Sequence, residues 1–368
     1  MMFGIDRRSI QNFDWVLLGM IAVLIVCGIG NLMSASHAGS DMLLTETVRR
    51  QLVALGVGTL VIGIVVAVDY RHVERFAPLI YGLVVALLAA TFVIADETRG
   101  ARAWLFSGRF QPSELAKIAM VIAMARWFHR NPPSEITRLR QLGPPAILAT
   151  IPVGLILLQK DMGVAVLTLL IALTYVPLVR VRLRAWAGVA AIGVVWLVAL
   201  WNFGLKDYQQ QRILDFVDPS RDPLSSGYQA MQSRIAIGSG GFFGKGWMDG
   251  TQTQLRFLPT QHTDFAYSVL AEEWGFTGSV FVLALYLAML LWGLWIARNS
   301  RDGFGTMLAV GLVGALFWPA AINVAMVLGL APVIGVPLPL FSYGGSAMVT
   351  TCLNLGLLLS ISMRRYVF

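Results

Sequence analysis

The sequence predicts an all-α polytopic membrane protein with about ten transmembrane helices and one long outward-facing loop. Charged residues make up 13% of the 368 residues and apolar residues 57%, and the mean hydropathy is +0.70. A soluble domain ordinarily carries about one quarter charged residues. Because a spanning helix needs about 20 mainly apolar residues and such runs recur along the whole chain, we expect a single membrane domain over residues 1–368.

Apolar runs of helical length define the expected helices. They are residues 15–36, 52–68, 77–95, 113–129, 146–158, 164–179, 187–203, 276–297, 306–330 and 342–363. The fifth run is short, because Pro144 and Pro145 precede it and Gln159-Lys160-Asp161 follows it. The boundary between the fifth and sixth helices is therefore the hardest one to place.

Arginines between the apolar runs indicate the orientation of the chain. Short basic loops stay on the inner side of a membrane. The arginines assigned to that side are Arg7, Arg8, Arg71, Arg75, Arg130, Arg138, Arg140, Arg180, Arg182, Arg184, Arg298, Arg301, Arg364 and Arg365. Residues 204–275 then form the large loop on the outer side. The net charge of +8 is explained by these topology signals, so no nucleic-acid partner is expected.

The start of the fourth expected helix carries two charges of opposite sign. In Gln111-Pro112-Ser113-Glu114-Leu115-Ala116-Lys117, Pro112 and Ser113 favour a helix start, and a glutamate in the first turn complements the helix dipole. Lys117 follows Glu114 at i+3, so the two side chains can form a local ion pair. Since a charge at membrane depth needs a partner or a wet cavity, Lys117 is also a candidate contact for an outer carboxylate or a ligand phosphate.

The polar stretch at the end of the long loop is where we place the chemistry. Asp264 lies beside the bilayer, where low dielectric and a cationic partner favour proton transfer, and a helix cap is its structural alternative. His262 is a candidate substrate contact, with plain hydrogen bonding or metal binding as alternatives. Glu272 and Glu273 are rival bases or charges of a solvated loop. Asp161 is a further outer carboxylate, or a turn residue.

A run of glycines, Gly238-Ser239-Gly240-Gly241-Phe242-Phe243-Gly244-Lys245-Gly246, superficially resembles a phosphate-binding loop. It lacks the pattern G-x-x-x-x-G-K-[ST], because Ser239 stands at the first glycine and Gly246 stands where Ser or Thr is needed. The glycines still permit close approach to a ligand such as a pyrophosphate, or simply a tight turn. The cations of this loop that are candidate ligand contacts are Lys245, Arg234 and Arg212.

The mouth of the last expected helix has an irregular, polar sequence, Val336-Pro337-Leu338-Pro339-Leu340-Phe341-Ser342-Tyr343-Gly344-Gly345-Ser346. Irregular backbone at membrane depth is tolerated where protein covers it or where it lines a cavity. We expect this stretch against the same outer pocket, with a covered turn as the alternative. Ser342 is its candidate substrate contact.

Four stretches, in this order along the chain, resemble motifs of the SEDS family of bacterial shape, elongation, division and sporulation proteins. They are Gln111-Pro112-Ser113-Glu114-Leu115-Ala116-Lys117, Ile235-Ala236-Ile237-Gly238-Ser239-Gly240-Gly241, Phe257-Leu258-Pro259 with His262-Thr263-Asp264-Phe265, and Pro337-Leu338-Pro339 with Ser342-Tyr343-Gly344-Gly345-Ser346. The resemblance covers nearly the whole chain. Lys245-Gly246-Trp247 and Gly250-Thr251-Gln252-Thr253-Gln254-Leu255 are more similar to the elongation branch, RodA, than to the division branch, FtsW.

This resemblance implies a peptidoglycan glycosyltransferase that polymerises lipid II into glycan strands during cell elongation. It implies a site on the periplasmic side of the inner membrane, and a class B penicillin-binding protein as crosslinking partner within an elongation complex. The family's essential aspartate corresponds to Asp264, and the lysine of its Pro-Ser-Glu-x-x-Lys motif to Lys117. The chain departs from the family at Lys160, where proline is common, and at Arg102, which precedes Ala103-Trp104 instead of pairing directly with the tryptophan.

The expected reaction is attack by the acceptor sugar's 4-hydroxyl on the donor's anomeric carbon, with Asp264 taking the proton and undecaprenyl pyrophosphate leaving. Lys117 either holds Asp264 ionised and oriented or stabilises the leaving group. Other groups that can stabilise the pyrophosphate are Arg109, Arg212, Arg234 and a divalent cation such as Mg²⁺ or Mn²⁺. A lipid II flippase that uses Glu114, Lys117 and Asp161 as a relay is the main alternative function, and a scaffold for partner enzymes is another.

Overall fold

The structure, a computed structural model, describes residues 12–37, 44–95, 102–105, 108, 110–199, 202, 210, 214 and 226–365. Within these ranges the chain forms helices, and its strand-like pairing is limited to an isolated bridge between Leu105 and Phe110. The helices are α2 (Trp15–His37), α3 (Glu46–Ala67), α4 (Tyr70–Ile94), α5 (Pro112–Arg130), η1 (Pro133–Glu135), η2 (Leu139–Leu142), α6 (Gly143–Leu158), α7 (Met162–Leu173), η3 (Val176–Leu178), α8 (Leu183–Ala199), α10 (Ser226–Ser239), α11 (Thr251–Gln254), α12 (Ala266–Arg298), α13 (Gly303–Val327) and α14 (Gly345–Met363).

The predicted all-α membrane fold is confirmed. Each of the ten expected helices overlaps one of α2 to α8 or α12 to α14. Seven helical segments of the described chain are long and apolar enough to cross a membrane, and residues 162–178 add a shorter apolar one. Helix α12 begins ten residues before the expected start at 276, and Gly275, with φ 64° and ψ −159°, breaks it at that boundary.

Short polar side chains begin several of these helices. The carboxylate of Asp69 accepts a hydrogen bond from the Arg71 amide at 3.0 Å, and that of Asp302 accepts one from the Gly305 amide at 2.6 Å. Each carboxylate satisfies an amide that has no partner within its helix and complements the positive end of the helix dipole. The acids at these turns thus define where the helices start.

The core of the bundle is built around α5 and α14, whose residues are mostly buried. Helix α5 packs against α4 and α13, and α14 packs against α3. Small residues allow helices to pack closely. At Gly58 of α3 an added Cβ would lie only 2.6 Å from Sγ of Cys352 of α14, so α3 and α14 can pack this closely only with glycine at position 58. Such small-residue contacts are typical of helix packing in membranes. The burial of α5 fixes its two charged residues inside the protein.

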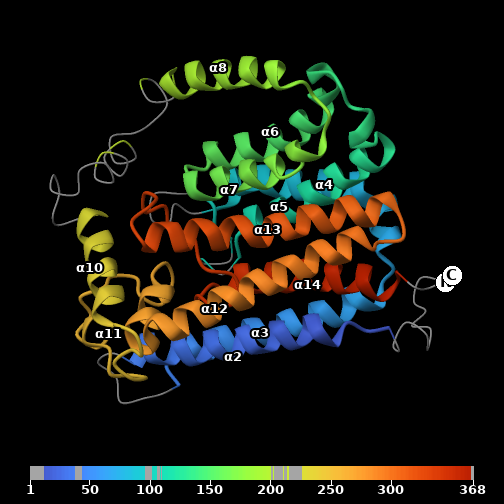
Figure 1. Cartoon of the computed structure of the whole chain (residues 1–368). Coiled ribbons are helices and arrows are strands. Elements are labelled where there is room, and N and C mark those ends of the chain that lie inside the picture. Colours follow the sequence, from blue (N-terminus) through green and yellow to red (C-terminus); the bar gives the residue numbers. More distant parts are fainter. Residues whose placement is uncertain are drawn as a thin grey trace.

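The long helices α2 to α5 and α12 to α14 run with roughly parallel axes, α10 runs across that direction, and α10 and α11 lie at one end of the bundle (Figure 1). Helix α2 starts, and α14 ends, at the opposite end. A hydrogen bond of 2.6 Å from the Ser362 hydroxyl to Asp14 Oδ2 joins α14 to the residue before α2. We call the first end the α10 end and the second the terminal end.

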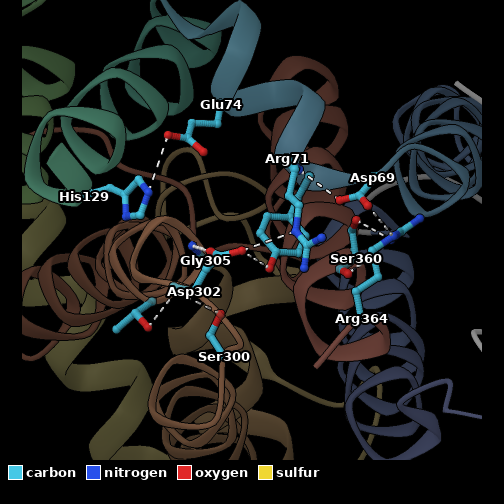
Figure 2. A network of polar contacts seen from close by, with 11 residues as sticks. Asp69, Arg71, Glu74, His129, Ser300, Asp302, Gly305, Ser360 and Arg364 are labelled. Atoms are coloured by element: carbon cyan, nitrogen blue, oxygen red, sulfur yellow. Dashed lines mark hydrogen bonds and ion pairs between the residues drawn. The ribbon is translucent and has the colours of Figure 1, made fainter. Parts of the chain in front are cut away.

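A network of polar contacts holds the terminal end together (Figure 2). The Tyr70 hydroxyl donates to Oδ2 of Asp302 at 2.8 Å, and Nε of Arg71 lies 3.4 Å from the same oxygen. Nε of Arg364 lies 3.8 Å from the carboxylate of Asp69. These charges are paired with one another and also cap helices, which indicates a structural role for this network.

Candidate functional site

Asp264 lies in the turn before α12, at the α10 end of the bundle. Its amide donates to the Thr260 carbonyl at 3.2 Å, and its carbonyl accepts from Nδ2 of Asn323 at 2.8 Å. The same Nδ2 atom donates to the Val336 carbonyl at 2.6 Å, so one amide of α13 ties the Asp264 turn to the segment between α13 and α14. Sequence reasoning missed Asn323, because an isolated amide in an apolar run gives no signal of its partner.

Gly335 adjoins the half-buried carboxylate of Asp264. A Cβ added at Gly335 would lie 3.5 Å from Oδ2 of Asp264, and the glycine has a positive φ of 72°. We call residues 328–344, which connect α13 to α14, the 328–344 segment. This segment forms one wall beside the candidate base.

The far end of the 328–344 segment is also fixed near Asp264. The Tyr343 amide donates to the His262 carbonyl at 2.9 Å, and the two rings lie 5.9 Å apart. The buried Ser342 hydroxyl accepts from the Leu338 amide at 3.0 Å, so the Ser342 side chain stabilises its own turn. Gln51 of α3 donates to the Ser342 carbonyl at 3.2 Å. These contacts bring together the predicted residues His262, Ser342 and Asp264.

A second set of predicted residues surrounds the start of α5. Nζ of Lys117 lies 2.8 Å from Oε1 of Glu114, which confirms the predicted local pair. Asp161, the N-cap of α7, accepts from Nε2 of Gln111 at 2.7 Å. The backbone N–H of Gln111 donates to the Ser346 hydroxyl at 3.1 Å, which links this set of residues to the start of α14.

Burial raises the pKa of the Asp161 carboxyl above its usual value. The nearby Glu114 carboxylate also raises this pKa. The pKa is lowered by the hydrogen bond from the Val164 backbone amide, by the Lys117 ammonium and by the hydrogen bond from the Gln111 side chain. Asp161, Glu114 and Lys117 therefore belong to one electrostatic cluster, which holds two acids and one cation. We call these three residues the α5 cluster.

Residues 334 and 335 of the 328–344 segment contact two different elements. Gly335 adjoins the Asp264 carboxylate. A Cβ added at Gly163 would lie 2.7 Å from the carbonyl oxygen of Ile334, so the first turn of α7 packs directly on this segment. Gly163 is two residues from Asp161. Two adjacent residues of one segment thus link Asp264 to the helix that begins at Asp161.

Of the predicted arginines, Arg234 is described, whereas Arg109 and Arg212 lie outside the described residues. Arg234 is exposed on α10, and a Cβ added at Gly329 would lie 3.2 Å from its Cδ. The neighbouring Ser233 hydroxyl donates to the Val327 carbonyl at 2.6 Å. Arg234 therefore borders the beginning of the 328–344 segment and remains a candidate ligand contact.

Lys245 contacts a carboxylate of α12. Its Nζ atom donates to Oε1 of the fully buried Glu272 at 2.8 Å and to the Thr251 hydroxyl at 2.7 Å. Glu272 also accepts from the amides of Gln252 and Thr253 at 2.9 and 3.1 Å. Glu272, one of the two glutamates considered as rival bases, thus stabilises the start of α11. Lys245 is its ion-pair partner and stabilises the same turn.

Glu273, the other rival base, is also buried. It accepts a hydrogen bond from the Ser34 hydroxyl of α2. The contact joins the first part of α12 to the end of α2. Both glutamates thus point into the protein and away from a solvated loop face, because each has an exposed fraction of 1% or less.

The described residues hold no group of three or more His, Cys, Asp or Glu side chains that could bind a metal ion. Mg²⁺ is ordinarily bound by one or two carboxylates together with phosphate oxygens. A divalent cation at this site would therefore combine a carboxylate of Asp264 or of the α5 cluster with the oxygens of a bound diphosphate.

A family model and individual relatives place this chain in the same protein family. A family model described as a cell cycle protein family, FtsW/RodA/SpoVE, matches residues 13–367. The peptidoglycan glycosyltransferase MrdB of Escherichia coli K12 is 39% identical, over 95% of this chain and 93% of MrdB. The peptidoglycan glycosyltransferase RodA of Treponema pallidum is 30% identical, over 97% of this chain and 99% of that protein.

Solved structures are similar over almost the full length. A chain of a peptidoglycan synthase complex, studied for structural coordination of polymerization and crosslinking, has a TM-score of 0.82 and 34% identity. The match covers 97% of this chain and 99% of that one. The rod shape determining protein RodA of Thermus thermophilus has a TM-score of 0.71 and 32% identity, with 97% and 98% covered. The family resemblance carried by the four sequence motifs is thereby confirmed.

Proposed function

Because the chain belongs to the FtsW/RodA/SpoVE family of cell cycle proteins, we propose that this peptidoglycan glycosyltransferase joins lipid II units into glycan strands at the α10 end of the bundle. One structural observation carries the proposal: residues 334 and 335 link the Asp264 carboxylate to the first turn of α7, two residues from Asp161 of the α5 cluster. A base and a cation held near one another are what transfer of a sugar from a diphosphate requires.

Asp264 acts as the general base in the proposed reaction. The 4-hydroxyl of the acceptor sugar attacks the anomeric carbon of the donor, a new C–O bond forms, and the hydroxyl proton passes to the Asp264 carboxylate. The bond between the anomeric carbon and the undecaprenyl diphosphate oxygen breaks, and the electron pair leaves with the diphosphate. General base assistance contributes about 100- to 10,000-fold to such a rate. The hydrogen bond from Asn323 to the Asp264 carbonyl fixes the backbone that carries the base.

Lys117 stabilises the leaving diphosphate. An ammonium group has three N–H donors, and Glu114 accepts from Lys117 at 2.8 Å, so further donors are available to ligand oxygens. Glu114 holds the Lys117 ammonium in place, and Asp161 interacts electrostatically with both of them. Arg234, at the start of the 328–344 segment, is a further contact for the diphosphate or the sugar.

The proposed location of the site is the periplasmic side of the bacterial inner membrane. Arg71 and Arg364, which the sequence assigns to the inner side, belong to the terminal-end network, whereas the long outer loop supplies α10 and α11 at the other end. Lipid II and the growing glycan chain would bind at this outer end, with the lipid tail between helices. A class B penicillin-binding protein of the elongation complex is the proposed crosslinking partner, supported by the similarity to a chain of a peptidoglycan synthase complex.

A lipid II carrier that uses Glu114, Lys117 and Asp161 as a relay is the rival function. Purified protein in liposomes separates the two, because a polymerase makes glycan strands from lipid II and a carrier moves lipid II across the bilayer without joining it. We expect polymer from the wild-type protein, and a rate about 100- to 10,000-fold lower from a matched Asp264→Asn preparation. Translocation of lipid II without any polymer, by protein that is folded and correctly inserted, would refute the proposed function.

A further inference from the structure

The C-terminal part of α2 holds the turn that carries Asp264. This part of α2 lies beside α11 and the start of α12 (Figure 1). Nδ2 of Asn31, on α2, donates to the carbonyl of Ala266 at 2.8 Å, two residues after Asp264. Nε2 of Gln261, three residues before Asp264, donates to the carbonyl of Ala35 on α2 at 2.7 Å. The turn is thus tied to α2 on both sides of the candidate base.

The same face of α2 contacts the 328–344 segment. A Cβ added at Gly28 would lie 2.7 Å from the carbonyl oxygen of Leu340, so the segment packs directly on the α2 backbone. Gly28, Asn31 and Ala35 are spaced i, i+3 and i+7, which places them on one face of the helix. One face of α2 therefore contacts both that segment and the turn that carries the candidate base.

Other polar contacts attach α2 to the chain on either side of this turn. Nε1 of Trp247 donates to the Gly30 carbonyl at 3.0 Å. The Ser34 hydroxyl donates to the carboxylate of Glu273. Because these contacts do not involve Asn31, α2 stays in place when the Asn31 side chain is replaced. The loss of its hydrogen bond then acts on the turn alone.

We infer that Asn31, with Gln261, is a positioning residue for the glycosyl transfer, one that fixes the direction in which the Asp264 carboxylate points. The inference rests on the proposed role of Asp264 as the general base. Asn323 holds the Asp264 carbonyl from α13, and Asn31 holds the same turn from α2. A general base must lie within hydrogen-bond reach of the proton that it removes, and a misplacement of about 1 Å can cost about 100-fold in rate.

Asn354 provides a matched control, because its surroundings resemble those of Asn31. The exposed fraction is 3% for Asn31 and 2% for Asn354. Nδ2 of Asn354, in the middle of α14, donates to the carbonyl of Leu312 on α13 at 3.1 Å. Neither Oδ1 atom has a hydrogen-bond partner among the residues that the structure describes. Leu312 precedes Asn323 by about three helical turns, so Asn354 joins two helices at a different level of the bundle.

Kinetics of lipid II polymerisation by the full-length protein in liposomes test the inference. Asn31→Leu removes the donor and is expected to lower kcat about 10- to 100-fold. KM is expected to stay within about twofold, because the lost contact affects the transition state and not the binding of substrate. Asn354→Leu, which removes an equivalent hydrogen bond, is expected to show a similar fall in thermal stability with an almost unchanged kcat. Equal losses of kcat at equal losses of stability would show that Asn31 is purely structural and would overturn the inference.

The double variant Asn31→Leu/Asp264→Asn shows whether Asn31 acts through the base. Once the carboxylate is removed its direction no longer matters, so the double variant is expected to have the same kcat as Asp264→Asn alone. A further fall equal to that caused by Asn31→Leu in the wild type would mean that Asn31 acts by another route, which would overturn the inference. A wild-type rate from Asp264→Asn alone would instead refute the proposed base.

Gln261→Leu removes the other tie between the turn and α2 and repeats the test from the opposite side. It is expected to lower kcat with KM unchanged and to have no further effect in the Asp264→Asn protein. This variant decides the question if Asn31→Leu does not fold. A wild-type kcat from folded Gln261→Leu, or a full additional loss in the Asp264→Asn protein, would then overturn the inference.

Discussion

Nζ of Lys117 lies 2.8 Å from Oε1 of Glu114, and both side chains are almost fully enclosed by protein. Removal of one member of a buried ion pair costs about 3–5 kcal/mol because the other charge stays buried. Lys117→Met is therefore expected to lower the free energy of unfolding strongly. The double variant Lys117→Met/Glu114→Gln, which has neither charge, is expected to recover most of that loss in thermal unfolding.

Glycan polymerisation by the same variants tests what Lys117 does besides pairing. If Lys117 stabilises the leaving diphosphate, the double variant is as inactive as Lys117→Met although its stability is recovered. Wild-type rates from the double variant would show that the lysine serves only to neutralise Glu114.

Asp161 makes stability depend on pH. Burial raises the pKa of its carboxyl in the folded protein, so the folded state holds the proton more tightly than the unfolded state. This contribution to stability is complete below the unfolded pKa of about 3.9 and is lost as the pH rises towards the folded pKa. Asp161→Asn retains a side-chain oxygen for the Val164 amide and is expected to remove this decline. Thermal unfolding between pH 4 and 8 measures it; an unchanged profile would contradict the prediction.

Gly275 is expected to tolerate no side chain. Its φ of 64° and ψ of −159° are almost exclusive to glycine, a strain of about 1–3 kcal/mol for other residues, and a Cβ would also meet the Gly244 nitrogen. Gly241→Ala is the matched control, because Gly241 also has a positive φ, of 57°, but has open space around the Cβ position. Thermal unfolding should show a clearly larger loss for Gly275→Ala than for Gly241→Ala. Equal losses would mean that the close packing of Gly275 against Gly244 contributes nothing to the free energy of unfolding.

Tyr70 tests whether the terminal-end network is purely structural. Tyr70→Phe removes the 2.8 Å hydrogen bond to Asp302 and is expected to cost about 0.5–1.5 kcal/mol. The Asp302 carboxylate keeps its contacts with Arg71 and the Gly305 amide. The polymerisation rate of the folded variant should equal that of the wild type. A fall in the polymerisation rate without a fall in stability would indicate that the terminal-end network affects the candidate site around Asp264.

Hydropathy and charge placement predicted the fold and most helix boundaries, because lipid-facing helices must be apolar along their whole length. The expected start of the eighth helix at 276 coincides with the break of α12 at Gly275. The helical segment before the break, residues 266–274, was missed, since Glu272 and Glu273 interrupt the apolar run. In the structure both carboxylates are buried and hydrogen-bonded. The sequence contains no signal that Lys245 and Thr253 would supply the donors for Glu272.

The candidate site residues could be predicted from charges in an apolar chain and from the family motifs. How these residues are arranged in space could not be predicted. The local pair of Glu114 and Lys117 was predictable from its i, i+3 spacing. Contacts between distant segments, such as those of Asn323 with Asp264 and of Gln51 with Ser342, depend on how helices pack. An amide within an apolar run does not reveal which segment it will contact.

The rate of glycan polymerisation by purified Asp264→Asn is the most direct test of the proposed base. The substitution preserves the size of the side chain and leaves the backbone contacts of residue 264 with Thr260 and Asn323 available. With folding matched to the wild type by thermal unfolding, the rate on lipid II is expected to fall by about 100- to 10,000-fold. A folded Asp264→Asn protein that polymerises lipid II at the wild-type rate would contradict the role given to this carboxylate.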